Sequence, residues 1–345
     1  MATTIPSVER PEDVLDNFIK NGLGLPAYVV GVFDLDKLEP KRAAFLASFK
    51  DVMNDEALRP QDLDGRRFHF DYLEVRNGKS NAFAFTEGNY AFIVVTMPLV
   101  DSCGDLSLRL CRSPIVRQIL GLHHEAHEAE EVGELQRLLF INLLSLLGLH
   151  EYTHLVHKHS GTGAMVWNEF SPSGPPKGSL HAQAQELDAD GYAGYLLLQG
   201  LLRGSPRHNA LATLKQRESS PSDADQLLLA LFFVTALSLF CEFWSLRKVH
   251  TSSFYDDDHP LPPVRIKYIL EVAKMWCDQN GLDSPWFTPA GSQELFRAVA
   301  GMIEPSRKGT WDVQMAALAS PAGVAYDGEL FKAFEAVRQK PDVAF

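Results

Sequence analysis

Several features that would place the chain in a familiar class are missing from its sequence. It has only four cysteines in 345 residues, and none forms a CxxC pair, which argues against a disulfide scaffold or a cysteine-bound metal. The first residues, MATTIPSVERPEDVLDN, have no apolar core of the kind that a signal peptide carries. We therefore expect a cytoplasmic protein whose thiols are free and buried.

A basic surface is missing as well. The formal net charge is −12 and the pI is about 5.5, which argues against nucleic acid as a partner because phosphate binding requires clustered Lys and Arg. No GxSxG motif, Walker loop or dinucleotide fingerprint occurs. The longest uncharged apolar run, residues 226–241, is shorter than the roughly 20 residues of a membrane span, so we expect a buried core helix and no membrane.

The apolar pattern predicts an α+β fold. Residues 10–22 and 37–58 have helical periodicity, and PAYVVGVFDLD between them is typical of a strand. The alternation over residues 68–100 is broken at NGKS and TEGN, which predicts a small antiparallel sheet, a β-meander. The sheet would pack on a helical body formed by long periodic segments, namely residues 131–157, 183–202, 223–248 and 262–280.

We expect one compact unit with three parts. Residues 1–65 would form an N-terminal α/β segment, residues 66–280 the core, and residues 281–345 a helical C-terminal extension. Two long loops, residues 160–179 and 250–263, are either lids over a site or disordered segments. In the cluster GLHHEAHEAEE, residues 121–131, His123 and His127 are four apart, as are His124 and Glu128, which suggests a second metal site, but the HExH motif within it has the wrong spacing for a helix face. We interpret the cluster as a polar linker, with a mobile lid over the cleft as the alternative.

The stretch LLGLHEYTHLVHKHSG, residues 146–161, contains the most specific chemical signal. His150 and His154 are four residues apart, so on a helix they lie on one face and can bind one ion. Glu151 projects beside that face, where it can take a proton from a water that the metal activates, which is the chemistry of HExxH. His157 lies about 10 Å from His150 along a helix, so we expect neither His157 nor His159 to be a ligand.

A catalytic zinc site commonly needs a third protein ligand, often a carboxylate from another helix. The segment HAQAQELDADGYAGYLL offers Glu186, Asp188 and Asp190. Glu186 and Asp190 are again four apart, so one could bind the metal while the other holds a ligand histidine by its second nitrogen. The alternative is an acidic, solvent-exposed helix face.

Together, HEYTH and ELDAD resemble the HExxH and ExxAD pair of zinc metallopeptidases with a glutamate ligand, in particular the family of the CAAX prenyl protease and the HtpX heat-shock protease. Upstream, NAFAFTEGNYAFIVVTMPLV, residues 81–100, resembles the strand, glycine turn and strand of that family. Downstream, HPLPPVRI, residues 259–266, resembles its histidine-proline motif with a following arginine. The four motifs occur in the order of the family and cover residues 81–270, which implies a minimal gluzincin-like core with an HExxH active-site helix.

The resemblance implies a role for each matching position. His150, His154 and Glu186 would bind one Zn²⁺ per chain, and Glu151 would be the general base. In the surroundings of the metal, three residues would act as follows: Asp190 would orient a ligand histidine, His259 would stabilise the oxyanion of the tetrahedral intermediate, and Arg265 would brace the His259 loop or the carboxylates. A surface salt bridge is the alternative role for Arg265.

The strand that begins at Asn81 would bind substrate. In such enzymes this strand resembles an edge on which an extended peptide lies, so the resemblance makes Asn81, Ala82 and Phe83 candidate substrate-binding residues. A turn residue is the alternative role for Asn81.

We therefore expect a soluble zinc metalloendopeptidase that acts on a protein or peptide substrate. A membrane-associated protease with the same chemistry and a non-catalytic zinc-containing binding protein are the alternatives. The long loops also raise the hypothesis of a regulatory partner that opens the cleft.

Overall fold

The structure is a computed structural model that describes most of the chain. The described residues are 9–22, 24–55, 63–122, 129–159, 179–214, 221–244, 254–255, 259–288, 290–291 and 305–338. They form two units, Met1–Ser102 with His154–Ser171, and Cys103–Thr153 with Pro172–Phe345. The division falls within helix α5 (Ala129–Val156), which continues unbroken through it.

The first unit contains a four-stranded mixed sheet. Its strands are β1 (Val29–Val32), β2 (Arg67–Val75), β3 (Ala82–Glu87) and β4 (Tyr90–Thr96), in the spatial order β1-β2-β4-β3. β1 pairs antiparallel with β2 and β3 antiparallel with β4, but β2 and β4 run parallel.

The predicted antiparallel meander is therefore wrong in one respect, because β2 and β3 are not neighbours. β4 lies between them, so that Ile93 aligns with Phe70 on one side and Ala84 on the other. Every residue of β4 is buried. Its uninterrupted apolar sequence YAFIVVT is typical of a central strand covered on both faces, and this burial favours the central position over the end of a meander.

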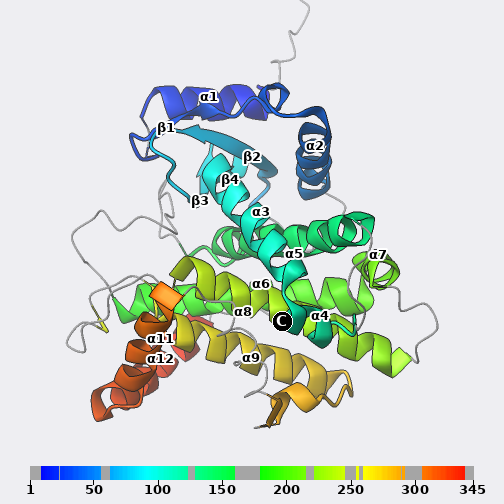
Figure 1. The fold of residues 1–345 in the computed structure, drawn as a ribbon. Helices are drawn as coiled ribbons and strands as arrows, with labels where there is room; N and C mark the ends of the chain where they lie inside the picture. The colour runs from blue at the N-terminus through cyan, green and yellow to red at the C-terminus, as the bar shows by residue number, and fades with distance from the viewer. Residues whose placement is uncertain are drawn as a thin grey trace, which may run out of the picture. The chain divides into compact units, whose positions relative to one another are not determined.

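Two helices accompany this sheet, as predicted. In Figure 1, α1 (Pro11–Lys20) lies over the sheet, and its Phe18 ring stacks on Phe85 of β3 with centroids 4.5 Å apart. α2 (Pro40–Asn54) packs on β2. Asn54, at its end, accepts a hydrogen bond from the Phe70 N–H at 2.7 Å and donates one to the Phe70 carbonyl at 3.1 Å, so it takes the place of a neighbouring strand. A short 3₁₀ helix, η1 (Leu35–Lys37), joins β1 to α2.

The second unit is helical. Helix α3 (Met97–Arg112) crosses from the first unit into it, and the other helices in chain order are α4 (Pro114–Ile119), α5, α6 (Leu180–Arg203), α7 (Pro206–Thr213), α8 (Pro221–Trp244), α9 (Pro262–Gln279), η3 (Pro285–Phe287), α11 (Pro305–Leu318) and α12 (Pro321–Arg338). α6 packs against α7, α8, α9 and α12, as Figure 1 shows for α8 and α9. The long helices expected from periodicity are thus present in α5, α6, α8 and α9, and α11 and α12 form the helical C-terminal part.

Two glycines bring α6 and α9 close together. A Cβ atom at Gly194 would lie 2.8 Å from Cγ1 of Ile269, and one at Gly191 would lie 3.2 Å from Cγ2 of Val272. Larger side chains would push α9 away from α6. The close approach sets α9, and with it Arg265, against the acidic residues of α6.

Within the described part of the chain, two helices have the length and composition of a membrane span. The apolar window of α8, Asp223–Glu242, is 89% buried in the structure, as expected for a core helix, whereas that of α5, Val132–Val156, is 50% buried. All four cysteines are free and buried, which confirms the sequence prediction. The cluster at residues 121–131 and the loops at 160–179 and 250–263 lie mostly outside the described residues.

Candidate metal centre

Helix α5 carries the histidines of the HEYTH stretch near its end. His150, Glu151 and His154 are buried, with exposed fractions of 4%, 1% and 1%. Because α5 is one continuous helix, His150 and His154 lie one turn apart on the same face. Leu146 and Leu147, in the preceding turn, are buried too, so the histidines stand on an apolar, rigid support.

Helix α6 supplies the carboxylates. It begins at Leu180, where the side chain of Ser179 accepts a hydrogen bond from the Ala182 N–H at 3.0 Å and caps the helix. Glu186 and Asp190 follow in the next two turns, and both are buried. This burial excludes the alternative of an acidic face exposed to solvent.

The two ring nitrogens of His150 face two different carboxylates. Nδ1 lies 2.9 Å from Oδ1 of Asp190, and Nε2 lies 3.4 Å from Oε2 of Glu186. With an ion bound between His150 and Glu186, Nδ1–H would donate to Asp190 and the Nε2 lone pair would be free for the ion. Two ligand atoms on a tetrahedral zinc are about 3.3 Å apart, given bond lengths of about 2.0–2.1 Å, so this separation fits a shared ion.

Arg265, from α9, binds the carboxylate of Asp190. Its Nε and Nη2 donate to Oδ2 and Oδ1 of Asp190 at 2.6 and 2.7 Å. The guanidinium also lies 3.4 Å from Glu186 and over the ring of Phe240, 5.2 Å from its centroid. Arg265 is fully buried, so this is not a surface salt bridge. Of the two roles considered for Arg265, the contacts match the bracing of the carboxylates.

His259 also reaches this group of residues. Its Nδ1 lies 2.9 Å from Oε2 of Glu186, and its side chain is 10% exposed. Burial raises the pKa of the Glu186 carboxyl, but the facing imidazoles of His259 and His150 more than offset this, so its pKa lies well below its usual range. Glu186 is therefore ionised, which is the form that binds a cation.

Among the described residues, two buried groups of three could each hold a metal ion. The first is His150, His154 and Glu186, and the second is His157, His159 and Asp188. In each group the potential ligand atoms lie within 4.8 Å of one another. The first group matches the three ligands expected from the sequence, and its donor set of two imidazoles and a carboxylate is one that zinc accepts.

The turn after α5 contributes a contact that the sequence analysis did not anticipate. Nδ1 of His159 lies 3.0 Å from Nδ1 of His154. The spacing of His159 in the sequence argues against it as a ligand of the ion that His150 and His154 would share, and gives no reason to expect this contact. No sequence signal marks the reversal at Lys158, where a non-glycine residue adopts a φ of 53°.

The proposed substrate strand lies in the first unit, where Asn81, Ala82 and Phe83 are all fully buried. Asn81 donates from Nδ2 to the hydroxyl of Tyr28 at 2.9 Å, and its N–H donates to the hydroxyl of Thr96 at 2.8 Å. These contacts anchor the start of β3. These exposed fractions cover the whole residue, so the main chain at residues 81–83 is buried together with the side chains.

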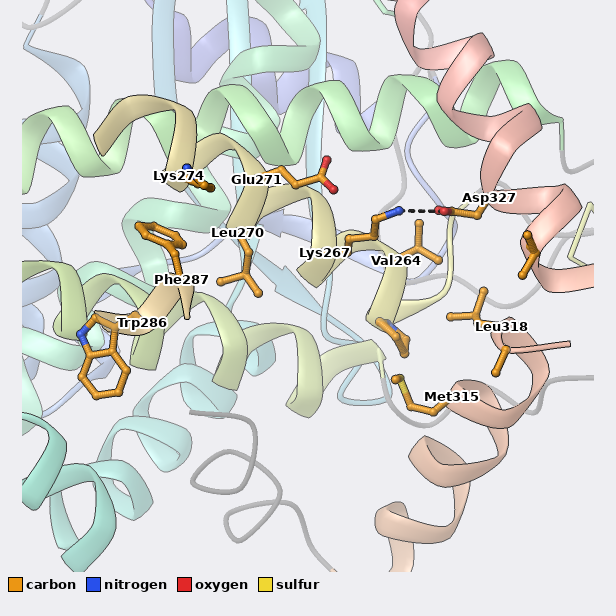
Figure 2. A pocket seen from close by; sticks show the side chains of 13 residues that line it. Val264, Lys267, Leu270, Glu271, Lys274, Trp286, Phe287, Met315, Leu318 and Asp327 are labelled. Atoms are coloured by element: carbon orange, nitrogen blue, oxygen red, sulfur yellow. Dashed lines mark hydrogen bonds and ion pairs between the residues drawn. The ribbon is translucent and has the colours of Figure 1, made fainter. Parts of the chain in front are cut away.

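A separate cavity of about 570 Å³ lies along α9. Figure 2 shows Val264, Lys267 and Leu270 facing it, with the Lys267–Asp327 ion pair of 2.7 Å at one side. These α9 residues point away from Arg265, since a helix turns about 100° per residue. None of the candidate metal ligands lines the cavity, so it is distinct from the metal centre.

Comparison of the chain with protein-family models, with curated proteins and with solved structures finds no match. The functional conclusion therefore depends on the residues themselves.

Proposed function

We propose that the protein is a zinc-dependent metalloendopeptidase, with one zinc ion held by His150, His154 and Glu186. The observation that carries the proposal is the pairing of His150 with two carboxylates, one on each ring nitrogen. A histidine whose Nδ1 is held by Asp190 presents Nε2 as a ligand in a fixed orientation. An ion pair that served stability alone would not require this arrangement.

Zinc bound at this position would polarise the scissile carbonyl and lower the pKa of a water molecule toward about 7. Glu151, next to His150 on α5, would accept the proton of the attacking water and then donate it to the leaving amine. His259 would donate a hydrogen bond to the oxyanion. Arg265 and Asp190 would hold His150 and the Glu186 carboxylate in place.

The substrate would be an extended peptide segment of a protein. β3 is the last strand in the described sheet, so its outer edge has no neighbouring strand among the described residues. Strand addition at such an edge recognises peptide main chain with little dependence on sequence. Because Ala82 and Phe83 are fully buried, a peptide would have to displace whatever covers this edge before it could pair with β3.

Glu151→Gln tests the chemistry. The variant keeps the size of the side chain but loses the base, so we expect it to retain zinc and to cleave fluorescently labelled casein roughly 10²–10⁴-fold more slowly. Glu134→Gln is the matched control, because Glu134 lies on the same helix but is exposed. It should leave both properties unchanged.

Two outcomes would contradict the proposal. Equal cleavage by Glu151→Gln and by the unmodified protein would remove Glu151 as the base. Zinc retained by the unmodified protein with no cleavage of any unfolded protein would favour a non-catalytic metal-binding protein.

A further inference from the structure

Helix α5 ends in a turn that reverses the chain. The N–H of His159 donates to the carbonyl of His154 at 3.1 Å, and Lys158, the residue before His159, has a φ of 53°. A left-handed residue followed by a hydrogen bond of this span is a Schellman motif, in which glycine usually takes the left-handed position. The turn directs His159 back toward the helix.

As a result, the imidazoles of His154 and His159 meet at the end of α5. The two Nδ1 atoms are 3.0 Å apart, the rings are inclined at 74°, and their centroids are 5.0 Å apart. Both residues are buried, with exposed fractions of 1% and 4%. The ring of His157 packs edge-on against His159 from the same turn, with centroids 5.5 Å apart.

This short contact requires one of the two facing nitrogens to donate and the other to accept. Two imidazole nitrogens at 3.0 Å form a hydrogen bond only when one carries a hydrogen and the other a lone pair. A metal on Nε2 of His154 would leave the hydrogen on Nδ1, so Nδ1 of His159 would be the acceptor and the His159 hydrogen would be on Nε2.

We propose that His159 is a positioning residue that orients His154 as a metal ligand. The inference rests on the proposed metal centre. His159 would do for His154 what Asp190 does for His150, but with a neutral acceptor in place of a carboxylate. Each ligand histidine of α5 then has its own partner on Nδ1. The partner of His150 is Asp190, and the partner of His154 is His159, which the Schellman turn brings to it.

The affinity for zinc, measured by competition with a chromophoric chelator, tests this role. Removing a hydrogen-bond partner of a ligand histidine typically weakens metal binding 10–100-fold, so we expect such a loss in His159→Ala. His159→Asn places a carbonyl oxygen close to the position of Nδ1 and should recover most of the affinity. His208→Ala, which removes an exposed imidazole from α7, is the matched control and should bind zinc as tightly as the unmodified protein.

Replacement of zinc by Co²⁺ gives a second measurement, the visible absorption spectrum, which reports on the ligands of the metal rather than on the packing of His159. The visible absorption of bound Co²⁺ depends on ligand geometry, so His159→Ala should alter the spectrum and His159→Asn should restore it. Far-ultraviolet circular dichroism of each variant checks that α5 is still folded.

Failure of the inference can be distinguished from failure of the metal centre. One zinc per chain with unchanged affinity in His159→Ala would overturn the positioning role and leave the metal centre intact. Two metal ions per chain, one of them lost in His159→Ala, would make His159 a ligand in the second group and would also overturn the role. No zinc in the unmodified protein would remove the proposed function itself.

Discussion

Asp71 is a single buried carboxyl, outside the candidate metal centre, that should make the stability of the first unit depend on pH. It is 2% exposed, and its oxygens lie 2.8 Å from Lys50 Nζ, 3.1 Å from His69 Nε2 and 2.8 Å from the Tyr72 N–H. Burial raises the pKa of Asp71, but the hydrogen bond with His69 and the charge of Lys50 outweigh it, so the pKa is lowered. Folding therefore favours the ionised form.

Asp71→Asn should destabilise the sheet of the first unit at neutral pH by about 2 kcal/mol, because a charged hydrogen-bond acceptor is lost. Since the folded pKa lies below the unfolded value of about 3.9, the stabilisation is fully present above that value and disappears as the pH falls through the folded pKa. Hydrogen exchange of the β2 and β4 amides at several pH values would measure this. A difference between the two proteins that persists unchanged in strong acid would contradict it.

The site residues differ in how far the sequence could predict them. His150, His154, Glu186 and Asp190 follow from spacing, because residues four apart share a helix face. The contact of His159 with His154 could not be predicted, since the position of His159 depends on the left-handed conformation of Lys158, which glycine or asparagine would ordinarily mark.

Among the helices, the packing of α9 on α6 positions residues of the candidate metal centre. Gly194 faces Ile269 so closely that a Cβ atom would lie 2.8 Å from it, whereas at Gly200, two turns further along α6, a Cβ atom would have nothing within 4 Å. Substitution of each glycine by alanine therefore distinguishes the effect of helix propensity, which both positions share, from the effect of packing, which only Gly194 has. Arg265 lies on α9 one turn before Ile269, so the same approach brings it to Asp190.

Gly200→Ala should raise the free energy of unfolding by up to about 1 kcal/mol, because alanine favours the helix. Gly194→Ala should gain the same propensity but lose about 1–3 kcal/mol through overpacking against Ile269, for a net destabilisation. Urea unfolding followed by circular dichroism would measure both variants. Equal stabilisation by the two substitutions would show that α6 and α9 do not need the close approach.

The elements also show what periodicity can and cannot predict. Helices α5, α6, α8 and α9 were predictable because their apolar residues recur with helical spacing over many turns. The parallel pairing of β2 with β4 was not, since alternation predicts a strand but not its neighbour. The order β1-β2-β4-β3 depends on which strands bury their faces, and only the continuous apolar sequence of β4 hinted at its central position.

At the scale of the whole molecule, the metal would link function to stability. His150, Glu186, Asp190 and Arg265 come from three helices of the second unit, and a zinc ion among the ligands would bind the folded state only. Ligand binding of this kind stabilises a protein by about 2.7 kcal/mol at a free concentration 100-fold above the Kd. The proposed function and this stabilisation therefore both depend on the metal content of the purified protein.

The most direct test is elemental analysis of the purified chain, unmodified and as Glu186→Ala, with Glu186→Gln as a second variant that preserves the side-chain volume. We predict about one zinc per chain in the unmodified protein and a sharp fall in both variants, with an unchanged circular dichroism spectrum. No metal in the unmodified protein, iron in place of zinc, or equal zinc in all three would contradict it.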